Sequence, residues 1–377
     1  DVHSNFDPSE VRPGWEDDRT GVAIGHLTLG GEPYTVAGRH ALRKAVSEWE
    51  QLGCSPKVGL ELEGYVLEPD GEGGWRRWST PRSFVYGTGR LADPDGLMDD
   101  IMSTAQASGI SIESINAEFD ESQFEMTLEY DDALKAADDA FLFRVLAREK
   151  AMQHGLDLTF LGKPFPGVSG SGVHVNFSLV DADGDNVLSD PSTDDGLSVI
   201  ARRCLAGLCA HHQGMTALCA PTVNAYRRLQ PGELNGYWAN WGFEHRCAGN
   251  RVPDARGQGT RIENRLSDGA ASVHTAVATV LQAARLGVVD ELACPDPLTT
   301  DGFEEINTDV SSASDLDTAL DHLEADPALV EAVGADLVAN FVAIKRAEWD
   351  RYIDAVGEDR GVEVITDWEL AEYLMYH

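Results

Sequence analysis

The sequence predicts an α+β fold, because two kinds of pattern occupy different parts of the chain. Segments that alternate between apolar and polar residues, as strands do, are concentrated in the first two thirds of the 377 residues. Patterns with helical spacing collect after them. The hydrophobic content of 42% is sufficient for a large core belonging to one big domain or two. No run of about 18 apolar residues occurs, so the sequence predicts no membrane-spanning helix.

The elements before residue 155 follow from local signals. Residues 21–36 predict two short strands joined by a Gly-Gly pair, and residues 38–53 predict a helix that ends in glycine. Residues 131–154 predict a long alanine-rich helix. Acidic residues stand at its start and a glycine follows its end, as the helix dipole and the C-cap favour.

The later elements begin with strands. Residues 158–165 and 173–180 predict one strand each, and an Asp-Gly turn follows the second. The remaining patterns are helical: two helices within 197–218, one within 269–287, and a region from Ala313 almost to the end, broken near residues 357–361. Its apolar row of Leu316, Leu320 and Leu323 is typical of a face that packs on a core.

One strand-like segment, Gly170 to Leu179, carries unusual polar residues. His174 and Asn176 lie two positions apart and therefore share a face. The glycines before them allow the backbone to approach a ligand closely. A histidine on the polar face of a single strand is more often an ordinary surface residue than a ligand.

The same arrangement recurs in three further segments, each with ionisable or amide side chains on one face and apolar ones on the other. These are Glu61 and Glu63 opposite Leu60 and Leu62; Gln123, Glu125 and Thr127 opposite Phe124, Met126 and Leu128; and Arg261, Glu263 and Arg265 opposite Ile262 and Leu266. Carboxylates are poor strand formers. Their recurrence predicts one polar cavity floored by a sheet.

Charge predicts the contents of that cavity. Converging glutamates repel one another unless cations neutralise them, and oxygen ligands with one imidazole suit Mg²⁺ or Mn²⁺ better than zinc. The interleaved Arg261 and Arg265 suit phosphate or carboxylate groups that bridge to such ions. Any single segment could instead be a solvated strand face with salt bridges. That alternative explains all four segments less well than a shared cation site does.

Composition excludes some partners. The net charge of −35 opposes binding to a nucleic-acid backbone. Only six of the 29 basic residues are lysines, which fits either selection for solubility in high salt or a bias toward arginine codons. The six cysteines form no C-x-x-C pair and are expected to be reduced core residues of a cytoplasmic protein: Cys54, Cys204, Cys209, Cys219, Cys247 and Cys294. No signal peptide is evident before the first predicted strand.

Six segments in order resemble the catalytic domain of the glutamine synthetase family over nearly the whole chain. They read "LELEGY", "AEFDESQFEMTL", "GKPFPGVSGSGVHVNFSL", "NAYRRLQPGELNGYWANWGFEHRCAGNRVP", "RIENRLSDGAASVHTA" and "ITDWELAEYLMYH". The resemblance implies a curved antiparallel sheet flanked by helices over residues 36–377. It also implies that residues 1–35 are a link that follows an N-terminal β-grasp domain, which these residues do not show.

The resemblance implies a role for each matching residue. One divalent cation would be bound by Glu63, Glu118 and Glu125, and a second by Glu61, His174 and Glu263. Glutamate would be bound by Arg228, Gly170, Ser169 and Glu63, and nucleotide phosphates by Arg246 and Arg251. The residues expected around the transferred phosphoryl group are Arg265, Arg246 and Asn176. The implied cofactors are ATP and Mg²⁺ or Mn²⁺, and the implied assembly is a homo-oligomeric ring without nucleic-acid or membrane partners.

The implied chemistry fits these residue types. A carboxylate is a poor acyl donor, so the γ-phosphoryl group of ATP first moves to the side chain of glutamate, and an amine then displaces phosphate. The first step requires positioning and charge neutralisation rather than covalent help from the protein.

Two departures from the family pattern bear on the amine. Asn176 stands where a second histidine is usual, and Leu234 stands where bacterial members place a glutamate over the ammonium site, with Glu233 before it. Because an ammonium site needs nearby negative charge, we expect an organic amine as substrate. Tyr237, Trp238 and Trp241 could form an apolar wall for it, or they could serve ordinary packing.

Four interpretations are therefore open. The favoured one is a ligase that joins glutamate to an organic amine. The second is ordinary glutamine synthetase, with Glu233 in the displaced role, and the third is a ligase whose acid is not glutamate. The fourth is an inactive structural or regulatory relative, which the complete set of six metal-ligand candidates disfavours.

Overall fold

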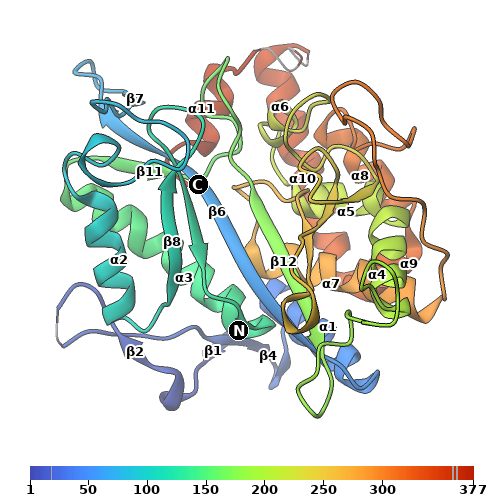
Figure 1. Ribbon diagram of the computed structural model, residues 1–377. Coiled ribbons are helices and arrows are strands. Elements are labelled where there is room, and N and C mark those ends of the chain that lie inside the picture. The colour runs from blue at the N-terminus through green and yellow to red at the C-terminus, as the bar shows by residue number, and fades with distance from the viewer. Residues whose placement is uncertain (18, 359–360, 362–363) are drawn as a thin grey trace.

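A computed structural model of the protein describes residues 1–17, 19–358, 361 and 364–377 (Figure 1). Its strands are β1 Val2–Asn5, β2 Arg12–Pro13, β3 Gly21–Val22, β4 His26–Leu29, β5 Glu32–Pro33, β6 Ser55–Pro69, β7 Trp75–Arg77, β8 Ile112–Ala117, β9 Gln123–Leu128, β10 Asp131–Asp132, β11 Asp157–Thr159, β12 Val173–Val180, β13 Trp241–Phe243, β14 Asn250–Val252 and β15 Ile262–Asn264. Its α-helices are α1 Gly38–Gln51, α2 Leu97–Ala107, α3 Ala133–Gln153, α4 Val199–Ala210, α5 His212–Cys219, α6 Ala225–Arg228, α7 Val273–Val289, α8 Leu316–Glu324, α9 Pro327–Val333, α10 Ala335–Val356 and α11 Asp367–Tyr373. Single 3₁₀ turns occupy Pro8–Glu10, Gly89–Leu91 and Gly257–Gly259.

A ten-stranded sheet organises the described residues, in the order β13-β14-β15-β12-β6-β9-β8 with β7, β10 and β11 also paired to β6. All of its pairings are antiparallel except β13 with β14. Figure 1 shows β6 crossing the centre of the molecule, with α2 and α3 on one side and α4, α5, α8 and α9 on the other. The predicted α+β class, with a largely antiparallel sheet flanked by helices, is confirmed.

The strand β6 pairs with five other strands, and its residues alternate between partly buried and buried from Ser55 to Gly64. Leu60 and Leu62 are buried, whereas Glu61 and Glu63, which alternate with them, are only partly buried. The apolar face belongs to the core and packs near α1 and α3. The opposite face carries the glutamates, as the period of two requires.

The helix α7 lies inside the molecule and is buried on almost every side. It packs closely on α4 because two glycines meet there: a methyl group at Gly207 would lie 2.2 Å from the carbonyl oxygen of Ala283, and one at Gly287 would lie 2.1 Å from that of Arg203. Such close approach explains why neither position carries a side chain.

Most predicted elements agree with the structure to within a few residues. The Gly-Gly pair joins β4 to β5, α1 and α3 occupy the first two predicted helices, and all six cysteines are free. The predicted late break follows α10, and residues 359, 360, 362 and 363 of it lie outside the described residues.

The strand predicted for residues 158–165 is wrong beyond its start. Of the predicted segment, only residues 158 and 159 belong to a strand, β11, which spans Asp157–Thr159 and pairs with β6. At Phe160 the backbone N–H turns away and donates to the carbonyl oxygen of His377 at 2.6 Å, so the chain leaves the sheet. The helix α2 and the strands β7, β8, β13 and β14 are not among the elements predicted from the sequence.

No single described helix combines the length and apolar composition needed to cross a membrane. The pair α9 and α10 meets that test only when taken together, and the two are bent by 107°.

Candidate active site

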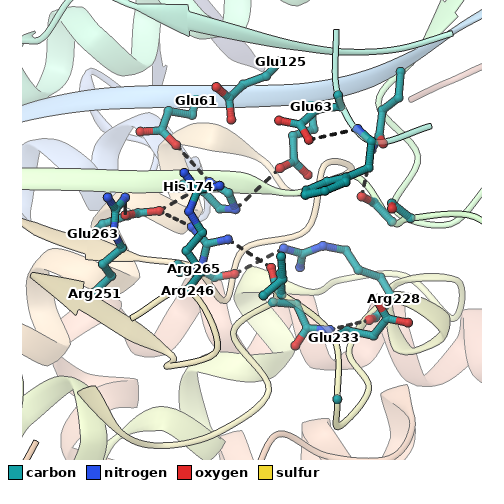
Figure 2. A pocket seen from close by; sticks show the side chains of 18 of the residues that line it. Glu61, Glu63, Glu125, His174, Arg228, Glu233, Arg246, Arg251, Glu263 and Arg265 are labelled. Carbon is teal, nitrogen blue, oxygen red and sulfur yellow. Dashed lines mark hydrogen bonds and ion pairs between the residues drawn. The ribbon is translucent and has the colours of Figure 1, made fainter. Parts of the chain in front are cut away.

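A cavity of about 430 Å³ opens over the polar face of the sheet. Side chains from β6, β9, β12 and β15 meet there, together with loops after β8 and α6 (Figure 2). It is lined by Glu61, Glu63, Tyr86, Glu118, Phe119, Gln123, Glu125, Ser169, Gly170, His174, Arg228, Gly232, Glu233, Leu234, Asn235, Arg246, Arg251, Glu263, Arg265 and Phe303. The shared cavity that the four polar strand faces predicted is therefore present.

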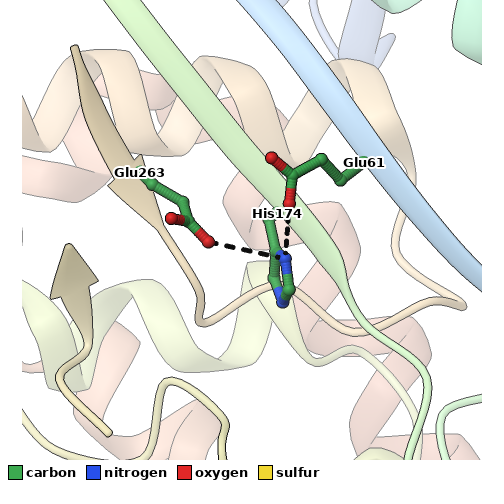
Figure 3. Close-up of side chains that lie close together, drawn as sticks. All are labelled: Glu61, His174 and Glu263. Carbon is green, nitrogen blue, oxygen red and sulfur yellow. Dashed lines mark hydrogen bonds and ion pairs between the residues drawn. The ribbon is translucent and has the colours of Figure 1, made fainter. Parts of the chain in front are cut away.

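His174 lies at the centre of two groups of potential metal ligands. The first group is Glu61, His174 and Glu263, and the second is Glu63, Glu125 and His174, with one ligand atom of each residue within 4.8 Å of the others. The Nδ1 atom of His174 is 3.0 Å from Glu61 Oε2 and 3.6 Å from Glu263 Oε1 (Figure 3). Antiparallel register produces this convergence, because His174 pairs with Glu61 and Glu63 pairs with Glu125.

Glu118 lies apart from both groups, although the resemblance places it with Glu63 and Glu125. Its side chain lines the cavity, and its Oε2 accepts a hydrogen bond from the backbone N–H of Phe119 at 3.2 Å. The structure thus brings together one predicted ligand set completely and the other in part.

Arginines face the carboxylates across the cavity, with Arg246, Arg251 and Arg265 on the side away from Glu61, Glu63 and Glu125 (Figure 2). Arg251 Nη1 donates to Glu263 Oε2 at 2.7 Å, and Arg265 Nη1 donates to the other oxygen of Glu263. Arg265 Nη2 also donates to the carbonyl oxygen of Leu234 at 3.0 Å.

Asn176 and Arg261 do not line this cavity. Asn176 Nδ2 donates to Glu61 Oε1 at 2.9 Å, and its Oδ1 accepts from Arg261 Nε at 3.2 Å. Asn176 therefore holds the carboxylate of Glu61, a potential metal ligand, from outside the cavity. The resemblance instead predicted Asn176 beside the transferred phosphoryl group.

The opposite end of the cavity is built around Arg228. Its guanidinium is buried and donates to the carbonyl oxygens of Leu266 and Arg265, at 3.2 Å each. Two glycines make room for its side chain, since a methyl group at Gly170 would lie 2.6 Å from Arg228 Cγ and one at Gly172 would lie 2.3 Å from Nη2.

The aromatic residues at the cavity differ from those considered in the sequence. Trp241 is buried and donates from Nε1 to the carbonyl oxygen of Pro295, and Tyr237 packs edge-on against Trp238. These three residues serve packing, and the described aromatic lining consists of Tyr86, Phe119 and Phe303. Phe119 adjoins Glu118 in a quoted motif, but Tyr86 and Phe303 come from loops without any periodic signal.

Comparison with known proteins identifies the family. The model of the glutamine synthetase catalytic domain matches residues 35–373. The chain belongs to the glutamine synthetase family.

Several glutamine synthetases are similar in sequence over most of this chain. That of Thermotoga maritima is 31% identical over 354 residues, which span 92% of this chain and 78% of the relative. That of Clostridium saccharobutylicum is 33% identical, over 91% of this chain and 77% of the relative. That of Halobacterium salinarum is also 33% identical, over 91% and 75%.

Solved structures of the family share the fold. Apo GmaS without ligand superposes with a TM-score of 0.85 and 29% identity, over 98% of this chain and 84% of that one. A GmaS/ADP complex superposes with a TM-score of 0.84 and 29% identity, over 99% and 85%. A structure described as a novel glutamine synthase homolog gives 0.82 and 26%, over 99% and 84%.

Enzymes of the glutamine synthetase family use ATP and a divalent metal ion, and the residues of this cavity fit such an ion. Burial and the charge of Glu61 raise the pKa of Glu125 to about 8, and burial and the charge of Glu63 raise the pKa of Glu118 to about 7. Against the effect of burial, hydrogen bonding to His174 keeps the pKa of Glu61 low. A divalent cation would allow all these carboxylates to ionise together.

Proposed function

We propose that the chain joins the side-chain carboxylate of glutamate to an organic amine, with ATP converted to ADP and phosphate. An ATP-dependent ligase that forms a C–N bond is what the family as a whole provides. The choice of an organic amine is carried by one observation: Leu234, an apolar residue whose backbone carbonyl oxygen accepts from Arg265, lines the cavity and is partly buried, while the neighbouring Glu233, which also lines it, is exposed.

The residues of the cavity would bind the amino acid at one end and the nucleotide at the other, with the phosphoryl group transferred between them. Arg228 at one end would bind the α-carboxylate of glutamate, with Ser169 and Gly170 beside it. Arg246 and Arg251 at the other end would bind nucleotide phosphates, and Arg265 between them would stabilise the charge that develops on the transferred phosphoryl group. Mg²⁺ or Mn²⁺ held by the groups around His174 would supply neutralisation of phosphate oxygens when bound.

The second half-reaction requires an uncharged amine to attack the acyl phosphate. A site that collects ammonium from water needs a carboxylate at short range, and Leu234 cannot provide one. An alkyl group gains from contact with apolar side chains instead, and Leu234, Phe119 and Tyr86 offer such contact on the cavity wall. The similarity to two structures of GmaS, a γ-glutamylmethylamide synthetase, supports the same choice.

The test compares nucleophiles with glutamate and ATP held saturating. We expect kcat/KM for short alkylamines to exceed that for ammonia by about tenfold or more, since the loss of one buried charge contact costs roughly 1.5 to 3 kcal/mol. Release of phosphate and mass spectrometry of the amide product are the measurements.

The alternatives predict other results. A preference for ammonia across the series would support ordinary glutamine synthetase, which the names of the similar curated relatives favour. Turnover with another acid in place of glutamate would indicate a different ligase, and no ATP cleavage with any acid or amine would indicate an inactive relative.

We also propose a homo-oligomeric ring. Three aromatic side chains gathered at the cavity, Tyr86, Phe119 and Phe303, are between 56% and 59% exposed, and a partner subunit that covers them would support this proposal. Sedimentation at low and high salt should give a mass several times that of the 40.8 kDa chain. A monomer under both conditions would contradict the ring.

A further inference from the structure

The loop Ser169–Gly170 enters the cavity beside Arg228, and its backbone is held by three side chains from other segments. Tyr65 on β6 donates from its hydroxyl to the carbonyl oxygen of Ser169 at 2.8 Å. Asp120, in the turn after β8, accepts from the N–H of Ser169 at 2.7 Å through Oδ2. Gln123 on β9 donates from Nε2 to the carbonyl oxygen of Gly170 at 2.9 Å.

The next two residues are fixed as well. The N–H of Ser171 donates to the carbonyl oxygen of Gly162 at 2.7 Å, and the N–H of Gly172 donates to Glu63 Oε2 at 2.6 Å. Between Ser169 and Gly172, therefore, Gly170 has the one backbone N–H without a partner among the described residues, and Gly170 lines the cavity. A free N–H beside the buried guanidinium of Arg228 suits an oxygen of a carboxylate.

The three side chains are well placed to fix this donor. Tyr65 and Gln123 are almost fully buried, at 0% and 1% exposure, and they belong to neighbouring strands whose register pairs them directly. The loop they hold has glycine at positions 167, 170 and 172, so without these hydrogen bonds its backbone would have many conformations to lose when a substrate binds.

We propose that Tyr65, Asp120 and Gln123 are positioning residues that hold the loop so that the N–H of Gly170 and the guanidinium of Arg228 face one carboxylate of the amino-acid substrate. This inference rests on the proposed use of glutamate. The hydrogen bonds order the loop before glutamate arrives, so they lower the free energy cost of binding it. They have no contact with the nucleotide end of the cavity and do not take part in the chemistry.

The test uses the full-length chain and the variants Tyr65→Phe, Asp120→Ala and Asp120→Asn. For Tyr65→Phe and Asp120→Ala we expect KM for glutamate to rise about five- to tenfold, the effect of one lost hydrogen bond, with KM for ATP and kcat changed less than about twofold. Asp120→Asn keeps an oxygen acceptor for the N–H of Ser169 and should restore KM for glutamate to near the original value.

A second measurement does not depend on activity. Without any substrate, backbone amides of residues 167–171 should exchange with solvent several times faster in Tyr65→Phe and Asp120→Ala than in the original chain. The matched control is Tyr373→Phe, which loses a buried tyrosine hydrogen bond to Glu348 at 2.7 Å but lines none of the described cavities. It should lower thermal stability without changing exchange in the loop or KM for glutamate.

The outcomes separate this inference from the proposed function. If the original chain uses glutamate but the KM values of Tyr65→Phe and Asp120→Ala for glutamate match that of Tyr373→Phe, the positioning role is wrong. If the chain does not turn over glutamate, the proposed function fails and so does the assignment of the carboxylate. Unchanged exchange in the loop of Tyr65→Phe and Asp120→Ala would overturn the inference in either case.

Discussion

Replacement of Glu125 by alanine is expected to lower glutamate-dependent cleavage of ATP by about 10²- to 10³-fold, the usual effect of removing one preorganised charge contact. Glu125 is partly buried, projects from β9 into the cavity and belongs to a group of potential metal ligands with Glu63 and His174. It carries no core packing, so the fold should remain. It is a better choice than Glu63, whose carboxylate also accepts the N–H of Gly172.

Two measurements are needed for Glu125→Ala. Release of ADP gives the activity, and the rise of melting temperature with added Mg²⁺ or Mn²⁺ reports metal binding without turnover. The matched control is Glu113→Ala, which removes an exposed carboxylate from β8 that does not line the cavity. Near-normal activity and an unchanged metal response in Glu125→Ala would show that this group does not bind a metal ion.

Replacement of Leu234 by glutamate is expected to raise kcat/KM for ammonia by about ten- to a hundredfold relative to that for methylamine. The backbone of Leu234 is anchored by Arg265, so a new side chain at this position should enter the same part of the cavity. A carboxylate there would attract ammonium. The methyl group of methylamine would displace water from that carboxylate without replacing its hydrogen bonds, which costs free energy. The two nucleophiles are supplied together, and mass spectrometry quantifies both amide products. The product ratio gives kcat/KM for ammonia relative to that for methylamine.

The comparison variant for Leu234→Glu is Glu233→Gln. If Glu233 already supplies the charge for ammonium, Glu233→Gln should abolish use of ammonia, and Leu234→Glu should add little. A ratio that Leu234→Glu does not change would contradict the assignment of Leu234 to the amine site.

Part of the site could be predicted from periodicity alone. Glu61, Glu63, Glu125, His174 and Glu263 lie on strands, and the period of two assigns each to the face opposite its apolar neighbours. The apolar neighbours of these residues pack in one core on one face of the sheet. The polar side chains therefore lie together on the opposite face.

Residues outside strands could not be found in this way. Arg228, Arg246 and Ser169 come from a short helix and loops, where side-chain direction depends on tertiary contacts, and only the resemblance to the family indicated them. Tyr86 has a positive φ of 62° and enters the cavity from a loop, and no local pattern indicates such a conformation. Asn176 was assigned to the correct face, but Arg261 and Glu61 occupy its hydrogen bonds and keep it from the cavity.

The strand β6 pairs with five others, and its 15 residues supply both core leucines and cavity glutamates. Insertion of one residue near its centre would turn Glu61 or Glu63 toward the core and a leucine toward the cavity. Insertion of two would restore the faces but would move the glutamates away from His174 and Glu125. Substitutions in the loops can therefore change the cavity wall without disturbing the sheet, whereas a change in the length of β6 would disrupt the hydrophobic interior and the cluster of carboxylates around His174 in the same step.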